Sequence, residues 1–159
     1  MKKKLKIIVV SLIVVGASLL AIYIFSEGKK REVKNIVITY NDVLRKAHLE
    51  MNASLLSRLT SEKQLKKVDS YIAFNLKNGR IIDGELRDLQ FQDIIIQENS
   101  AIVVTIERWG WVYMDPGSKK PVSEMFDDVY GNTYSLVRTG GHWVVDDIDS
   151  NVIDASPKE

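Results

Sequence analysis

The sequence predicts an α+β protein: an N-terminal transmembrane helix, then two helices packed on a strongly curved antiparallel sheet of about four strands. Three observations lead to this fold class. Residues 7–25 contain no charged side chain, residues 33–76 repeat apolar side chains every three or four positions, and after Arg80 the apolar period falls to two. Because both helices precede all of the strands, the order does not suit a parallel α/β sheet.

Length and charge restrict the partners. The chain has 159 residues, which suits one globular domain plus a short extra segment. From residue 32 onward, 15 Lys and Arg stand against 20 Asp and Glu. This acidic balance repels phosphate backbones, so we do not expect nucleic acid as a partner. The absence of cysteine excludes disulfides, thiolate catalysis, zinc–thiolate sites and lipid attachment through Cys.

The uncharged segment 7–25 has the length of a membrane span. Its 19 residues make a helix of about 28 Å, which matches the hydrocarbon core of a bilayer. Thirteen of them are Ile, Leu, Val or Phe, and together these favour insertion by about 5 kcal/mol. We therefore interpret 7–25 as a single-pass anchor in contact with membrane lipid. The alternative is a signal peptide cleaved near Gly16-Ala17-Ser18, which would leave the apolar residues 19–25 in water.

This interpretation divides the chain into five parts. They are a cytoplasmic tail at 1–6, the anchor at 7–25, a polar linker at 26–32, the α+β domain at 33–150 and a flexible tail at 151–159. Basic residues flank both ends of the span almost equally, so the positive-inside rule discriminates little between the two orientations. A six-residue tail is easily left inside, which favours a domain outside the cytoplasm, at the cell (inner or cytoplasmic) membrane.

The domain is expected to begin with two amphipathic helices. From Val33 to Met51 apolar side chains recur at spacings of three and four and form one core-facing stripe. Ser61 and Gln64 have the spacing of a capping box that opens the second helix, and Asn78-Gly79 supplies its left-handed stop.

The remainder of the domain is predicted to be β structure. Strands are expected at about 85–97, 101–115, 128–138 and 142–149. Thr139-Gly140-Gly141 joins the last two strands as a hairpin. Gly110 marks a bulge or bend in the long second strand, and the tail from Ser150 has little to bury.

The run from Ile102 to Asp149 resembles the intermembrane-space domain of chloroplast division proteins and its bacterial relatives. The likeness is carried by a long strand at 102–107, a variable acidic loop, a strand around 134–138, a glycine turn and the segment His142-Trp143-Val144-Val145-Asp146-Asp147. The resemblance implies a cystatin-like or nuclear-transport-factor-like fold. It also implies a noncatalytic domain that holds a membrane-linked assembly together by binding a peptide of a partner. It assigns no individual site residue.

Three aromatic residues, Trp109, Trp111 and Tyr113, share one side of the predicted second strand, because residues two apart point the same way. The opposite side is interpreted as core: Ile102, Val104, Ile106, Val112 and Met114. We predict that the aromatic row and its neighbours bind a partner through Trp109, Trp111, Tyr113, Tyr130, Tyr134 and Trp143. The alternative is that these rings close the interior of the domain itself.

No motif of a hydrolase, nucleotide-binding protein or metalloprotease occurs, so no catalytic residue, metal site or cofactor is predicted. The run 147–151 alternates oxygen ligands like a calcium loop, but Val152 and Lys158 stand where that loop needs Gly and Glu. The two histidines, His48 and His142, have no spacing partner and are interpreted as structural or exposed.

The sequence therefore favours a noncatalytic, membrane-anchored scaffold or accessory domain that binds another envelope protein or peptide. Two alternatives stay open: a subunit of a secretion or conjugation machine with a similar layout, and a cone-shaped pocket for a small molecule or a reaction. A reaction would need a carboxylate near a tyrosine, and five residues could supply such a pair: Asp83, Asp146, Tyr113, Tyr130 and Tyr134. A homodimer is a further open alternative.

Overall fold

The computed structural model describes the backbone of residues 2–155 and the side chains of residue 24 and residues 26–153. The chain divides into two compact units, Met1–Glu32 and Val33–Glu159. Helix α1 is assigned to Lys2–Glu50, so the predicted linker at 26–32 has helical backbone.

The predicted anchor lies outside the described side chains except at Ile24. Among the residues whose side chains the structure describes, no helix combines the length and the apolar character that a membrane crossing requires. The anchor at 7–25 and the tail at 1–6 therefore stay predictions.

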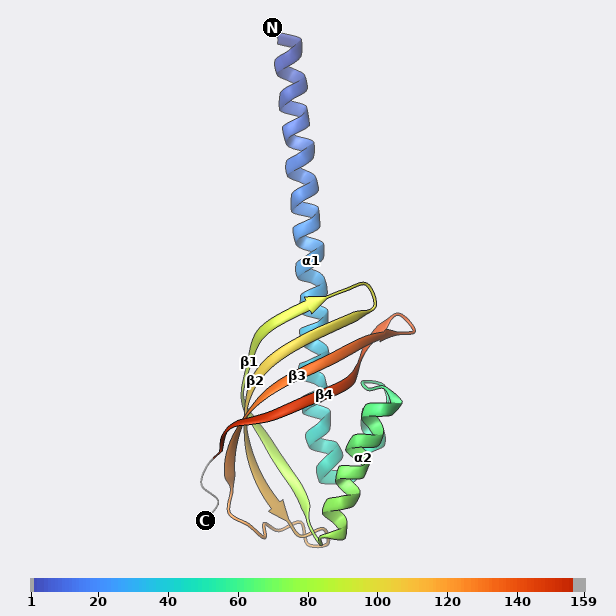
Figure 1. Cartoon of the computed structure of the whole chain (residues 1–159), viewed down its shortest axis with the longest axis vertical. Coiled ribbons are helices and arrows are strands. Elements are labelled where there is room, and N and C mark those ends of the chain that lie inside the picture. The colour runs from blue at the N-terminus through green and yellow to red at the C-terminus, as the bar shows by residue number, and fades with distance from the viewer. Residues whose placement is uncertain (1, 156–159) are drawn as a thin grey trace. The chain divides into compact units, whose positions relative to one another are not determined.

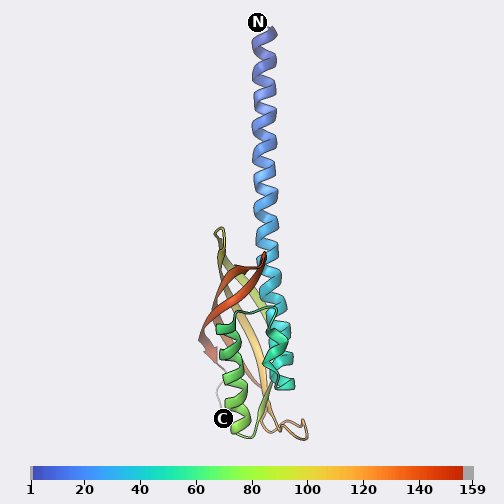
Figure 2. The ribbon, with the colours of Figure 1, turned by 90° about the vertical axis from the view of Figure 1, so that its right-hand side faces the viewer.

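The second unit consists of helices on one side and a single sheet on the other. Its elements after α1 are the 3-10 helix η1 (Ala53–Leu56), α2 (Glu62–Lys77), β1 (Ile81–Ile96), β2 (Ser100–Met114), β3 (Phe126–Thr139) and β4 (His142–Ala155). The strands pair in the order β1-β2-β3-β4, and every neighbouring pair is antiparallel. Figures 1 and 2 show α2 and the C-terminal part of α1 against the same concave face of the sheet. The predicted α+β class, with two helices and four antiparallel strands, is confirmed.

The apolar stripe of α1 forms one wall of the core. Val33, Val37 and Ala47 are fully buried, and they join one hydrophobic cluster with Val103 and Leu136 of the central strands. Burial of each large aliphatic side chain contributes about 1.5–3 kcal/mol, so packing rather than helix propensity holds this part of α1 in place.

Both predicted ends of the second helix are present. The Ser61 side chain accepts a hydrogen bond from the backbone N–H of Gln64 at 3.3 Å, as an N-cap does. Gly79 follows the helix with a φ of +68°, a conformation that glycine adopts without a steric penalty. The side chain of Gln64 does not complete a capping box, because its Nε2 donates to the hydroxyl of Tyr40 at 2.9 Å.

The curvature of the sheet originates in its two outer strands. Arg87 and Gln92 are extra residues in β1, and Asp146 and Ile153 are extra residues in β4, whereas β2 and β3 pair with each other without a shift. Bulges lengthen one strand relative to its partner and increase the local twist. With two bulges on each outer strand, the sheet bends around the helices.

Gly110 is not itself a bulge, contrary to the sequence interpretation, because its register with both neighbouring strands is unbroken. The bulge lies in the neighbouring strand β1, at Arg87, two residues after Glu85, which pairs with Gly110. The guanidinium of Arg87 lies over Gly110, where a Cβ would come within 2.8 Å of it, and Nη1 donates to Asp127 of β3 at 2.6 Å. Because Gly110 has no side chain, the side chain of Arg87 can pass over β2 and reach Asp127 in β3.

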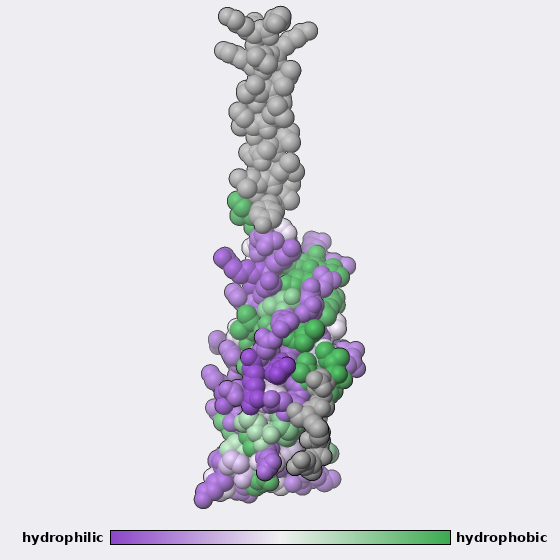
Figure 3. All heavy atoms as spheres, turned by 90° about the vertical axis from the view of Figure 1, so that its left-hand side faces the viewer, coloured by the Kyte–Doolittle hydropathy of each residue, from purple (hydrophilic) through white to green (hydrophobic). Residues whose placement is uncertain are grey.

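The core face of β2 is opposite to the one predicted, and Trp109 of the aromatic row lies on it, as the alternative interpretation expected. Val103, Thr105 and Trp109 point toward the helices and are buried. The residues predicted as core on the other face, Ile102, Val104 and Ile106, are only half-buried. Figure 3, which looks at the domain from the side of the sheet, shows hydrophobic atoms gathered on that outer surface. Apolar residues on both faces of β2 explain the error, since alternation alone cannot tell which face is covered.

Strand β4 is longer than predicted. Its last part, from Asn151 to Ala155, pairs with residues 128–131 of β3 around the extra residue Ile153, although the sequence suggested a flexible tail with little to bury. Pairing with β3, which begins as early as Phe126, orders this segment through backbone hydrogen bonds. Residues 156–159 of the predicted tail lie outside the described residues.

A comparison of two glycines tests the packing of the sheet against its aromatic residues. A methyl group at Gly84 would collide with the six-membered ring of Trp111, whereas at Gly131 it would meet only the flexible end of Ile153 at 3.4 Å. We predict that Gly84→Ala lowers the free energy of unfolding by about 1–3 kcal/mol, and that Gly131→Ala changes it by less than about 0.5 kcal/mol. Urea denaturation followed by tryptophan fluorescence measures both; equal stability of the two variants would contradict this packing.

Candidate functional site

A buried carboxylate lies at the centre of the concave face of the sheet. Glu107 of β2 is 1% exposed. Its Oε1 accepts hydrogen bonds from the hydroxyls of Thr105 at 2.8 Å and Tyr134 at 2.7 Å, and its Oε2 accepts from the indole N–H of Trp109 at 2.9 Å. Burial of a charged group is costly unless donors replace the lost water. These three donors replace it.

The donors come from elements that are far apart in sequence. Thr105 and Trp109 flank Glu107 on the inner face of β2, whereas Tyr134 belongs to β3, where it pairs with Val103. The Tyr134 hydroxyl also lies 3.1 Å from Oδ1 of Asn41 in α1. The carboxylate therefore ties two strands together and brings the tyrosine to the buried face of the first helix.

A hydroxyl has one proton, so Tyr134 cannot donate to Glu107 and Asn41 at once. The shorter distance favours Glu107, and the amide of Asn41 then fits best with its Nδ2 turned toward the tyrosine oxygen. In the structure, Nδ2 of Asn41 lacks a protein partner, although the residue is only 2% exposed. Asn132 of β3, at 6% exposed, likewise leaves its Oδ1 without a partner.

Two tyrosine hydroxyls of this region keep their protons. Burial, together with the charge of Glu107, raises the pKa of Tyr134 well above its usual value. Burial also raises the pKa of Tyr40 to about 12, despite the hydrogen bond from Gln64. Both side chains are therefore neutral hydrogen-bonding groups at physiological pH rather than tyrosinates.

A cavity of about 170 Å³ opens beside this cluster, which we call the Glu107 cavity. Its walls come from both helices and from β2, β3 and β4. The lining residues are Tyr40, Asn41, Leu44, Tyr71, Glu107, Trp109, Trp111, Tyr130, Asn132, Tyr134, Ile148 and Ser150. A dry cavity of about 150 Å³ is large enough to hold benzene. The Glu107 cavity therefore has the volume of a small organic molecule.

Four of the six predicted partner-binding residues meet at this cavity. Trp109 and Trp111 stack with ring centroids 4.8 Å apart, and the edge of Tyr130 meets Trp111 at 6.4 Å. Tyr134 completes the group, with Tyr40 edge-on to its ring at 6.2 Å. Trp109 and Tyr134 are buried, so these aromatic residues line the inside of the domain.

The other two predicted partner-binding residues lie elsewhere. Trp143 is buried in the main core, and the guanidinium of Arg138 lies 5.6 Å from its ring. Tyr113 is half-buried near the end of β2, between the guanidinium of Arg80 at 3.9 Å and the ring of Phe126 at 5.5 Å. That these six aromatic residues contact a partner stays a prediction.

Neither carboxylate proposed for a carboxylate–tyrosine pair, Asp83 or Asp146, lines the Glu107 cavity. Asp83 pairs with Arg45 at 2.9 Å, and Asp146 is an extra residue of β4. The neighbouring Asp147, from the calcium-like run, accepts from Lys63 at 2.6 Å and also from Lys67, which lowers its pKa to about 2. In the described part of the chain, no group of three or more His, Cys, Asp or Glu side chains is arranged to hold a metal ion.

Sequence reasoning missed Glu107, Asn41 and Asn132. Glu107 was overlooked because a single Glu in a β-branched strand is usually exposed. The sequence did contain one signal. Thr105, Glu107 and Trp109 are two residues apart and share one face of the strand, so a buried Trp109 implies a buried Glu107. Asn41 and Asn132 gave no signal, since a polar residue beside a helix stripe or in a hairpin strand is ordinary.

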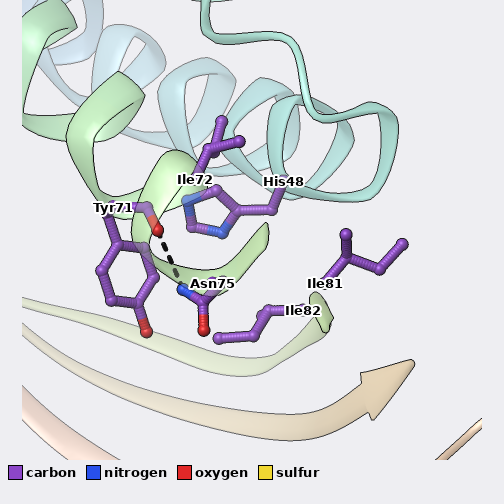
Figure 4. Close-up of a pocket in the computed structure, with 6 residues that line it drawn as sticks. All are labelled: His48, Tyr71, Ile72, Asn75, Ile81 and Ile82. Atoms are coloured by element: carbon purple, nitrogen blue, oxygen red, sulfur yellow. Dashed lines mark hydrogen bonds between the residues drawn. The ribbon is translucent and has the colours of Figure 1, made fainter. Parts of the chain in front are cut away.

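A second, smaller void lies under α2, shown in Figure 4. It measures about 10 Å³, room for no more than one water, and His48 and Tyr71 are among its lining residues. The imidazole of His48 is 8% exposed, its Nδ1 lacks a protein partner, and its centroid lies 5.5 Å from that of Tyr71. Burial lowers the pKa of His48 to about 4. The structural role predicted for His48 agrees with this position, whereas His142 is exposed.

Comparison with known proteins identifies the fold. No family model matches this chain, and no curated protein matches it in sequence. Among solved structures, it is similar to the intermembrane space region of the chloroplast protein ARC6. The TM-score is 0.65 with 16% identity, over 77% of this chain and 95% of that chain. The resemblance predicted from the sequence is confirmed at the level of an intermembrane-space-type fold. The wider cystatin-like or nuclear-transport-factor-like assignment stays a prediction.

The buried histidine predicts an acid-sensitive stability. The pKa of His48 is lower in the folded chain than its ordinary value of 6.5, so the unfolded chain takes up the proton first as the pH falls. The free energy of unfolding should fall by roughly 2–3 kcal/mol between pH 7 and pH 4. Urea denaturation at several pH values measures this loss, and His48→Leu should flatten it.

Two features keep this test specific. The contribution of Asp147, with a pKa of about 2, is lost only below about pH 4, outside the window. The exposed His142 serves as the control, and His142→Gln should retain the loss. The same pH dependence in His48→Leu and the parent would contradict the buried, neutral histidine.

Proposed function

We propose that this chain is a noncatalytic, membrane-tethered interaction domain, anchored by residues 7–25 with the domain facing outside the cytoplasm. The observation that carries the proposal is the fold. It is similar to the intermembrane space region of the chloroplast protein ARC6. The uncharged 7–25 segment supports a tether, because its length and composition suit a bilayer span.

The interaction surface that we propose lies at the end of β2 where Tyr113 is half-buried. The connection between β2 and β3 folds back on this strand: the backbone N–H of Val122 donates to the Tyr113 carbonyl at 2.8 Å. Val122 is 60% exposed and Met125 is 52% exposed. Large apolar side chains beside aromatic rings are typical anchors of protein interfaces, so this loop extends the predicted partner-binding surface outward.

A second candidate function is a small-molecule pocket, and the Glu107 cavity is the observation that favours it. The two functions do not exclude each other. A membrane-tethered domain can bind a protein at the β2–β3 connection and hold a ligand between its helices and its sheet.

Site-specific photocrosslinking in intact cells tests the proposed function. A photoreactive amino acid replaces Val122 in the full-length chain, and Ile95 is the matched control, because it is 51% exposed and lies near the opposite end of β2. After irradiation, the membranes are washed with alkaline carbonate. We expect the chain to remain in the washed membranes and position 122, but not 95, to give a discrete crosslinked adduct. Release of the chain by the wash, or the same adducts from both positions, would contradict the proposal.

A further inference from the structure

The Glu107 cavity contains a buried carboxyl group that no basic side chain of its walls pairs with. None of its lining residues is Lys, Arg or His. Two arginines of the domain have other partners: Arg45, next to the lining residue Leu44, pairs with Asp83, and Arg80 lies on the ring of Tyr113. Glu107 itself receives hydrogen bonds only from uncharged donors. A carboxylate at 1% exposure with neutral donors alone leaves the site electrostatically favourable for a cation.

Aromatic rings supply half of the lining residues. They are Tyr40, Tyr71, Trp109, Trp111, Tyr130 and Tyr134. The face of an aromatic ring is the negative end of its quadrupole, so several rings around one space attract an organic cation and also accept its apolar body. The combination of a buried carboxylate with an aromatic wall is the chemistry that recognises ammonium groups.

Open acceptor positions on Glu107 and Asn132 favour a cation that carries N–H donors; the indole N–H of Trp111 is a further unpartnered group of the wall. A carboxylate offers about four acceptor positions, and Glu107 uses three of them. Oδ1 of Asn132 accepts no hydrogen bond, although the residue is 6% exposed and lines the cavity. A primary ammonium can donate to both acceptors at once, whereas a quaternary ammonium has no N–H to offer.

The exposure of the lining residues points to a mouth between α2 and β4. Tyr71 of α2 is 47% exposed and Ser150 of β4 is exposed, whereas Glu107 and Trp109 are buried. A ligand can therefore enter past Tyr71 and Ser150 with its ammonium group first. The volume of about 170 Å³ limits the body of the ligand to roughly the size of a benzene ring or a lysine side chain.

We propose that the Glu107 cavity binds a primary ammonium group on a short apolar or aromatic body, with Glu107 and Asn132 as acceptors and the surrounding rings as walls. The group is carried either by a free amine or by a lysine side chain of a peptide. This site is separate from the surface proposed at Val122, and it stands whether or not that surface binds a partner.

Calorimetric titration of the full-length protein with benzylammonium tests the proposal, with benzyl alcohol as the uncharged probe of the same shape. The indole N–H signals of Trp109 and Trp111 in ¹⁵N-labelled protein localise the binding, and Trp143 serves as the internal reference. We expect saturable binding of benzylammonium that shifts the first two signals and not the third. Benzyl alcohol and tetramethylammonium should bind at least tenfold more weakly.

Two variants and one control separate binding in the cavity from binding elsewhere. Glu107→Gln removes the charge at nearly constant shape and should weaken benzylammonium at least tenfold, whereas Glu98→Gln, in the exposed turn between β1 and β2, should leave it unchanged. If Glu107→Gln does not fold, Ser150→Trp provides an independent test, because it alters only an exposed position at the mouth. It should block entry while the melting temperature stays within a few degrees.

A short peptide with one central lysine distinguishes the two sources of the ammonium group. Tighter binding of the peptide than of benzylammonium assigns the site to a protein side chain, and the reverse assigns it to a free amine; both results support the cation site. No saturable binding of either probe, equal affinity for benzyl alcohol, or unchanged affinity in Ser150→Trp would overturn the proposal.

Discussion

The hydrogen-bonded carboxylate of Glu107 is the constraint on which the interior of the domain depends. It is buried on the inner face of β2, and three donors from β2 and β3 surround it. Removal of any one donor would leave part of a charge unsatisfied in a medium of low polarity, which typically costs more than an ordinary hydrogen bond contributes. The positions of Trp109 and Tyr134, and hence the walls of the cavity, follow from this requirement.

The backbone provides the space that these rings occupy. Bulges in β1 and β4 bend the sheet, and the glycine at position 84 lets Trp111 lie flat against β1. On the outer face, Gly110 lets Arg87 reach Asp127 across the middle strand. Two glycines and four extra residues thus shape a pocket in a sheet that regular pairing would have left flatter and filled with side chains.

Much of the fold could be predicted from the sequence, because its signals are local. The helix stripe after Val33, the cap at Ser61 and the turn at Gly79 each depend on neighbouring residues, and all are present. The site could not be predicted, since it joins Asn41, Glu107 and Tyr134 across long separations in the chain. The inner face of β2 was misassigned because apolar side chains occur on both of its faces.

A double-mutant cycle between Glu107 and Tyr134 tests the central claim most directly. The free energies of unfolding of the parent, Glu107→Gln, Tyr134→Phe and the double variant give the coupling between the two side chains, free of effects that each change has alone. We predict a favourable coupling of about 1–3 kcal/mol, as expected for a buried hydrogen bond to a charged group. A coupling below about 0.3 kcal/mol, within the additivity seen for independent sites, would contradict the account.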